Sequence, residues 1–173
     1  GGDDYLSKPI NFVVLEAKMR SMQRTLVLQH HVADSLRRLQ TISDNVLEAI
    51  VTIDTDATII SCNRAVETLF GWQPEELVGQ NVKVLCPEPF RSEHDTYVHD
   101  YVAGGPPRII GLSREVPAAR RDGSTFSAEL TVSEVRLEQR RMFIGVVRDI
   151  SERKRAERLL QENAERLQRY HDA

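Results

Sequence analysis

The N-terminal part of the chain has the apolar pattern of a long helix. No proline or glycine occurs in residues 11–41, and Gln29 alone interrupts a seam of apolar or small residues. This seam consists of Leu15, Met19, Met22, Leu26, Ala33 and Leu36. A helix of about 30 residues is about 45 Å long and cannot bury such a seam against a small domain. Residues 11–41 are therefore predicted to form a parallel coiled-coil dimer, and the alternative is a helix lying on its own domain.

A second helix is predicted for residues 151–173. Asp149 can accept hydrogen bonds from the first free amides, and Glu152 follows three residues later, as in a capping box. The apolar stripe is weak and consists of Ala156, Leu159 or Leu160, Leu167 and Tyr170, among many charged residues. This pattern favours a solvated linker helix that leads to an output domain beyond this sequence.

Between these helices the apolar period changes from that of a helix to that of a strand. The predicted strands are residues 49–54, 58–63, 108–119, 125–137 and 142–148. Short helices are predicted after the second strand, between residues 64 and 102. Five strands with helices inserted in this way predict an α+β fold, in which short helices cover one face of an antiparallel sheet. The sheet domain is expected to span residues 42–150.

Composition narrows the class of protein. The chain has 40% hydrophobic and 28% charged residues, which is typical of a folded domain, and its net charge is −3. This charge gives no general attraction to nucleic acid or to an anionic membrane. No apolar run is long enough to span a bilayer, and the first residues lack the pattern of a signal peptide, so a cytoplasmic location is expected.

Few residues outside the central segment 87–116 suggest a catalytic or ligand-binding role. Cys62 and Cys86 fit neither a disulfide framework nor a metal motif and are interpreted as small core residues. The pairs 120–121 and 140–141 are arginines and are interpreted as solvated charges beside hairpin turns. No nucleophile with a base and no phosphate-binding loop is found, so the chain is not expected to be an enzyme.

The first residues resemble the end of another domain. Residues 1–9 read GGDDYLSKP, which is similar to the last strand and loop of a response-regulator receiver domain. In that family the lysine, here Lys8, meets the aspartyl phosphate. The resemblance implies that residues 1–10 are the C-terminal remnant of an upstream receiver domain.

The central region resembles the PAS family of sensor domains. The matching segments are Asn63-Arg64-Ala65, Leu69-Phe70-Gly71-Trp72, Glu76-Leu77-Val78-Gly79, Arg121-Asp122-Gly123-Ser124 and Asp149-Ile150-Ser151-Glu152-Arg153. Residues 87–98, which read PEPFRSEHDTYV, and residues 109–116, which read IIGLSREV, are similar to the haem-binding PAS domains of FixL-like oxygen sensors. This narrower resemblance covers about 110 residues.

The FixL-like resemblance implies a haem b site. It assigns His94 as the proximal iron ligand, Arg114 as the group that serves bound oxygen and a propionate, and Leu130 and Val132 as distal apolar residues. The full set of residues expected to contact haem is His94, Tyr97, Arg108, Ile109, Arg114, Leu130 and Val132. A neutral imidazole is a suitable axial ligand for iron, and a guanidinium stabilises the partial negative charge of bound oxygen.

Two positions depart from the family pattern. Asp100 stands where a propionate-contacting arginine is expected, and Arg108 replaces a histidine near the propionates. His94 could instead cap or pair with Asp95 on a solvated helix, and His99 is a rival ligand nearby. The sequence therefore predicts a dimeric sensor, and the FixL-like resemblance implies that it binds haem and responds to O2 or another diatomic gas. The alternative is a PAS domain without a cofactor, which dimerises and relays receiver phosphorylation to the output domain.

Overall fold

The computed structural model describes residues 12–107 and 109–171, which form two units that divide after Thr41. The first unit contains most of helix α1 (Phe12–Asp44), which is continuous, so the predicted long helix is confirmed. Its apolar side chains are exposed, for example Met19, Met22 and Leu26. Its coiled-coil pairing stays a prediction. The segment predicted to be a receiver remnant lies outside the described residues.

The second unit is built on an antiparallel sheet. Its strands are β1 (Ala49–Ile53), β2 (Ile59–Cys62), β3 (Ser113–Ala119), β4 (Thr125–Leu137) and β5 (Arg140–Asp149). All five lie in one sheet with the order β2-β1-β5-β4-β3. The strands β4 and β5 are long and central, while β2 and β3 form the edges. The predicted α+β fold is confirmed.

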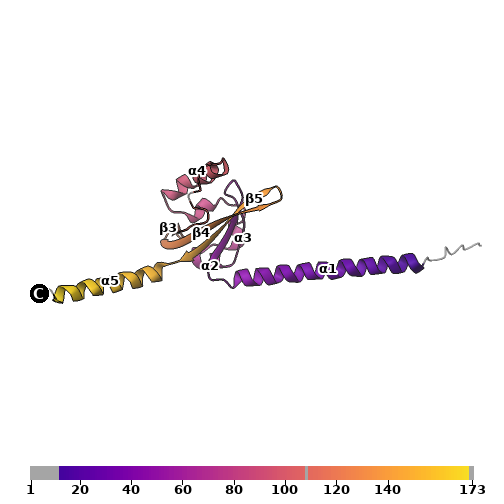
Figure 1. Ribbon diagram of the computed structural model, residues 1–173, viewed down its shortest axis with the longest axis horizontal. Helices are drawn as coiled ribbons and strands as arrows, with labels where there is room; N and C mark the ends of the chain where they lie inside the picture. Colours follow the sequence, from indigo (N-terminus) through magenta and orange to yellow (C-terminus); the bar gives the residue numbers. More distant parts are fainter. Residues whose placement is uncertain (1–11, 108, 172–173) are drawn as a thin grey trace, which may run out of the picture. The chain divides into compact units, whose positions relative to one another are not determined.

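The segment between β2 and β3 forms four short helices that lie over one face of the sheet (Figure 1). They are α2 (Ala65–Phe70), α3 (Pro74–Leu77), the 3-10 helix η1 (Val82–Leu85) and α4 (Phe90–Val102). The core lies between these helices and the sheet. Its most deeply buried large side chains are Phe70, Ile59, Leu77 and Val66.

Local sequence explains where these helices begin and end. Helix α2 ends at Gly71, which adopts the left-handed conformation (φ +75°) that glycine accepts without steric cost. Helix α3 starts with Pro74 in its first turn, and Gln73 and Glu76 form a reciprocal capping box before it. These two signals turn the chain twice within a few residues. They place the loop before α4 above the sheet.

The strand predicted from residue 108 begins later than expected. Residues 109–112 form a turn instead, in which the Leu112 amide donates to the Ile109 carbonyl (3.2 Å) and Gly111 has φ +77°. A left-handed residue cannot continue an extended strand, so β3 begins only at Ser113.

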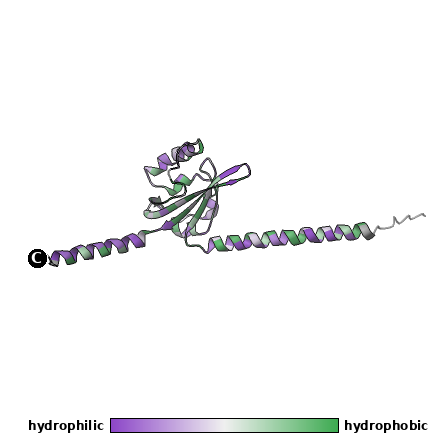
Figure 2. Ribbon diagram, viewed as in Figure 1, coloured by the Kyte–Doolittle hydropathy of each residue, from purple (hydrophilic) through white to green (hydrophobic). Residues whose placement is uncertain are grey.

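Helix α5 (Ser151–His171) follows β5 directly. The Asp149 carboxylate accepts a hydrogen bond from the Ser151 amide (2.8 Å), as the capping prediction required. The reciprocal bond expected from Glu152 is not found among the described residues. Hydrophilic residues predominate along α5 (Figure 2), and Leu159, Leu160 and Leu167 are exposed. None of the helices in the described ranges is long and apolar enough to cross a bilayer.

Candidate functional site

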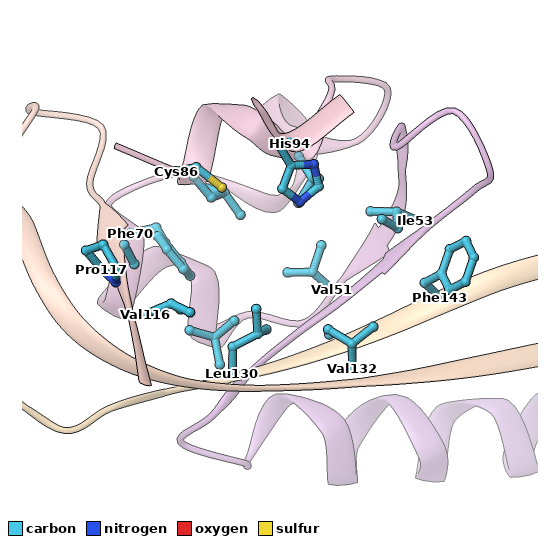
Figure 3. Close-up of a pocket in the computed structure, with 15 residues that line it drawn as sticks. Val51, Ile53, Phe70, Cys86, His94, Val116, Pro117, Leu130, Val132 and Phe143 are labelled. Carbon is cyan, nitrogen blue, oxygen red and sulfur yellow. The ribbon is translucent and has the colours of Figure 1, made fainter. Parts of the chain in front are cut away.

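An apolar cavity of about 110 Å³ lies between the short helices and the sheet. Helices and the loop before α4 line one side, and β1, β3, β4 and β5 line the other (Figure 3). Residues on its walls include Val51, Phe70, Leu85, Cys86, Val116, Leu130 and Val147. The alternation of side chains along each strand explains why residues two apart, such as Leu130 and Val132, face the same space.

A second cavity, of about 180 Å³, adjoins the first near α4 and the turn that precedes β3. It is lined by residues such as Tyr97, Tyr101, Pro106, Ile109 and Ile110. Both cavities share the residues Ile53, His94, Leu130, Val132 and Phe143. The two spaces therefore meet at His94, which is the imidazole common to both. We call them the inner and the outer cavity.

His94 points from α4 toward Val51, Leu130 and Val132 (Figure 3). Its Nδ1 atom is buried and has no hydrogen-bond partner in the described part of the chain. Burial lowers the pKa of His94 from its ordinary value of 6.5, against an opposing effect of the neighbouring Asp95 carboxylate. The imidazole is thus held in its neutral form, which is the form that binds metal ions.

No side chain of helix α4 is fully buried, and polar contacts together with the packing of the Tyr101 ring on Phe143 hold the helix in place. The Asp95 carboxylate accepts a hydrogen bond from Asn81 (2.8 Å) and forms an ion pair with Lys83 (2.7 Å). Because Asp95 follows His94 directly, this contact with η1 fixes the helical turn that carries the imidazole. The interpretation of His94 as a residue that pairs with Asp95 is not supported by these contacts, since Asp95 bonds to η1.

The structure brings most of the predicted haem-contacting residues together. Tyr97, Ile109, Leu130 and Val132 line the outer cavity together with His94. Arg114 lies directly opposite Leu130 in the β3–β4 pairing, but its side chain is exposed and does not line either cavity. Arg108 lies outside the described residues.

His99 and Asp100, which the sequence analysis also singled out, lie at different places relative to the cavities. His99 is exposed on α4 and lines neither of the two cavities. The rival assignment of His99 as an internal ligand therefore has no geometric support. Asp100 lines the outer cavity, so the departure from the family pattern lies within the site.

Sequence reasoning missed a polar cluster beside the outer cavity. The Tyr101 hydroxyl donates to Glu134 (2.8 Å), and Arg141 donates to the same carboxylate (2.5 Å) and to the Val102 carbonyl (3.1 Å). Hydrogen bonds from Arg136, Arg141 and Tyr101 lower the pKa of Glu134 to about 2. The cluster ties the end of α4 to the β4–β5 hairpin.

The interpretation of the arginine pairs as solvated charges is wrong in part. Arg120 forms an ion pair with Asp149 (3.2 Å) and stacks over the Phe126 ring, and Arg141 belongs to the cluster above. Arg121 pairs with Glu76 (2.7 Å) and lies over Trp72. Their partners come from distant segments, so adjacency in sequence gave no sign of them.

The two cysteines are half-buried rather than fully buried. Cys62 packs against the core, and burial raises the pKa of its thiol. Cys86 lines the inner cavity, and burial raises the pKa of its thiol to about 11. Both thiols are therefore protonated at neutral pH, in agreement with the interpretation of small apolar residues.

The model of the PAS fold matches residues 37–150. The chain belongs to the PAS family. Among curated relatives, this PAS chain is 40% identical over 124 residues to the sensor protein FixL of Bradyrhizobium diazoefficiens, a match that covers 72% of this chain and 25% of FixL. It is 31% identical over 110 residues to the oxygen sensor protein DosP of Escherichia coli, covering 64% of this chain and 14% of DosP.

A solved structure shows the same PAS fold. The PAS domain of an HTR-like protein from Haloarcula marismortui superimposes with a TM-score of 0.58 at 24% identity and covers 70% of this chain and 97% of that one. At this identity the likeness concerns the fold alone. The PAS chain spans a quarter of FixL and about a seventh of DosP, so it corresponds to one segment of such signalling proteins.

Proposed function

We propose that this PAS domain is a gas sensor that binds haem b through His94. The observation that carries the proposal is the position of His94, whose neutral imidazole faces the junction of two apolar cavities and has a buried nitrogen without a partner. Histidine is a usual axial ligand of haem iron, and the apolar walls of the two cavities suit the macrocycle. The residues present therefore fit the group at its ligand and along its faces.

The walls of the cavity would control what binds. When bound, haem b would supply an iron that takes up diatomic gases, such as O2. Leu130 and Val132 would keep the cavity dry, and Arg114, which is paired with Leu130 across the β3–β4 ladder, would turn inward to offer a positive charge. The similarity to FixL and to DosP supports O2 or another diatomic gas as the signal.

Asp100 places a negative charge at the outer cavity, where the proposed haem would bind. Haem carries two propionates, which Asp100 would repel. We assign the compensating positive charge to Arg114 and, from its place in the sequence, to Arg108. We therefore expect this site to bind haem less tightly than a site that lacks Asp100.

The output of the domain is proposed to be conformational and not catalytic. A change in the cavity would shift the populations of two arrangements of α1 and α5. These helices would form a homodimer and connect a receiver domain upstream to an output domain downstream. Light scattering of the whole chain tests the dimer, and a strict monomer at high concentration would contradict it.

A hemin titration tests the haem proposal. Trp72 is the only tryptophan of the chain, so quenching of its fluorescence reports binding independently of the Soret band. We expect the native chain to take up one haem per chain with a sharp Soret band. His94→Ala should lose this band, whereas His99→Ala, which removes an exposed histidine of the same helix, should keep it. Equal binding by His94→Ala would contradict the proposal.

The second candidate function is a relay without a cofactor. The presence of Asp100 in the outer cavity and the exposed apolar residues of α1 favour it. If the native chain binds no hemin while its circular dichroism shows an intact fold, the domain is assigned to dimerisation and relay. His94→Ala would then leave the fold and the dimer unchanged.

A further inference from the structure

Two carboxylates face each other on the side of the sheet away from the cavities. Glu115 of β3 lies directly opposite Glu129 of β4 in the antiparallel pairing. Their sequence neighbours Val116 and Leu130 line the inner cavity, so alternation directs the two carboxylates to the other face. Like charges at directly opposed positions of an antiparallel pair are destabilising. This arrangement requires a nearby cation.

The first turn of α5 supplies that positive charge. Arg153 contacts one oxygen of Glu115 (3.0 Å) and Lys154 contacts the other (2.5 Å). Arg153 also approaches Glu129 (4.0 Å). Basic residues are unfavourable in the first turn of a helix, where the backbone already carries partial positive charge. Arg153 also pairs with Glu157 within α5 (3.7 Å), so the acidic pair on the sheet and the helix share this cation. Both ion pairs of Lys154 and Arg153 with Glu115 join α5 to β3.

The strand that carries Glu115 is also a wall of the proposed sensor site. Val116 follows Glu115 in β3 and lines the inner cavity. Strand β3 is an edge strand, paired only with β4 in the described sheet, so it is restrained on one side alone. A shift of β3 at the cavity would move Glu115 with it.

We infer that Glu115 is a positioning residue that ties the first turn of α5 to β3, so that a change at the cavity wall reaches α5 through this side chain. The inference rests on the proposed function in one respect, namely that α5 carries the signal. The contacts are partly exposed, with 48% of the Glu115 side chain accessible. Such ion pairs are weak and are screened by salt, which suits a contact that breaks and reforms.

Hydrogen exchange of the full chain without any ligand tests the contact itself. Glu115→Gln is expected to speed exchange in the first turn of α5 by roughly threefold to tenfold, while amides in β4 and β5 stay unchanged. Glu67→Gln is the matched control, because it removes the same charge from an ion pair between Glu67 of α2 and Arg64, the residue just before that helix. Unchanged exchange of α5 in Glu115→Gln would overturn the inference.

The coupling between the cavity wall and α5 is tested by introducing one cavity substitution into the native chain and into Glu115→Gln. Val116→Ala trims the cavity face of β3 and should alter α5 exchange in the native background but add nothing in Glu115→Gln. The absence of any effect in the native background, or equal effects in both, would overturn the inference. Protection of β4 and β5 amides shows in each case that the sheet remains folded.

Hemin then serves as a second probe. In the native chain, binding of hemin should change the rate of hydrogen exchange of the α5 amides. In Glu115→Gln this change should be lost, although the Soret titration shows that the variant binds hemin as the native chain does. An equal change in both chains would contradict the coupling role. If neither chain takes up hemin, the haem proposal fails, and the Val116→Ala comparison still decides the role of Glu115.

Discussion

Asn63 is expected to be the most sensitive polar residue of the domain. It is only 3% exposed, and its side-chain amide makes three hydrogen bonds. Its Oδ1 accepts a bond from the Ile50 amide (2.9 Å), and its Nδ2 donates to the carbonyls of Ser43 (2.8 Å) and Glu48 (3.0 Å). Asn63 therefore ties the end of α1 and the segment before β1 to the end of β2.

The three hydrogen bonds of Asn63 set the expected loss of stability in Asn63→Ala. Each contributes about 0.5–1.5 kcal/mol, and Asn63→Ala leaves an amide and two carbonyls to find other partners, so we expect a loss of about 3 kcal/mol in unfolding free energy. For a domain of about 110 residues, each kcal/mol lowers the melting temperature by roughly 4 °C. The variant should melt roughly 12 °C below the native chain.

Circular dichroism during heating and urea titration measures this loss. Asn163→Ala, at an exposed position of α5, is the control and should leave the melting temperature within about 2 °C of the native value. Asn63→Asp should also be destabilising, because a carboxylate would face the two carbonyls. A melting temperature for Asn63→Ala within about 3 °C of the native value would refute the argument.

Two further predictions concern acid stability and the core. The folded-state pKa of Glu134 is about 2, below its ordinary value of 4.5, so its contribution is present above pH 4.5 and is lost as the pH falls toward 2. Glu134→Gln should flatten the loss of stability over that interval in acid unfolding, and a curve parallel to the native one would contradict this. Phe70→Ala should cost about 3–5 kcal/mol in urea unfolding, because the ring is buried against Phe126. Phe90→Ala, at a residue that is 42% exposed, should cost less than about 1 kcal/mol, and equal losses would refute the argument.

The fold could be predicted because local signals agree with the tertiary structure. The change from a helical to an alternating period marked the sheet, and Gly71 and Pro74 marked the ends of the short helices. The start of β3 was missed because Gly111 takes a left-handed conformation within an otherwise strand-like run. Nothing in the residue pattern distinguishes a glycine in a strand from one in a turn.

The candidate site could be predicted only as far as the family motif reached. His94, Leu130 and Val132 meet at the cavities as the motif implied. The motif did not indicate that the Arg114 side chain is exposed, since that depends on the packing at the edge of the sheet. His99 could be separated from His94 only by seeing which side of α4 faces the cavity.

The polar contacts that hold α4 could not be predicted at all. Glu134 is 33 residues from Tyr101, and the two meet only because the β4–β5 hairpin extends under the end of α4. Likewise, Asp95 contacts Asn81 and Lys83 through the fold of η1. Such pairs depend on strand register and loop path, which a single sequence does not reveal.

Chemical rescue tests the central claim, that His94 holds a haem in the cavity, most directly. His94→Gly removes the imidazole and leaves space for a free one. The account predicts that this variant binds hemin weakly without imidazole and regains a one-to-one Soret band, with quenching of Trp72, when imidazole is added. A Soret band that does not change on addition of imidazole, in a chain with an intact fold, would contradict it.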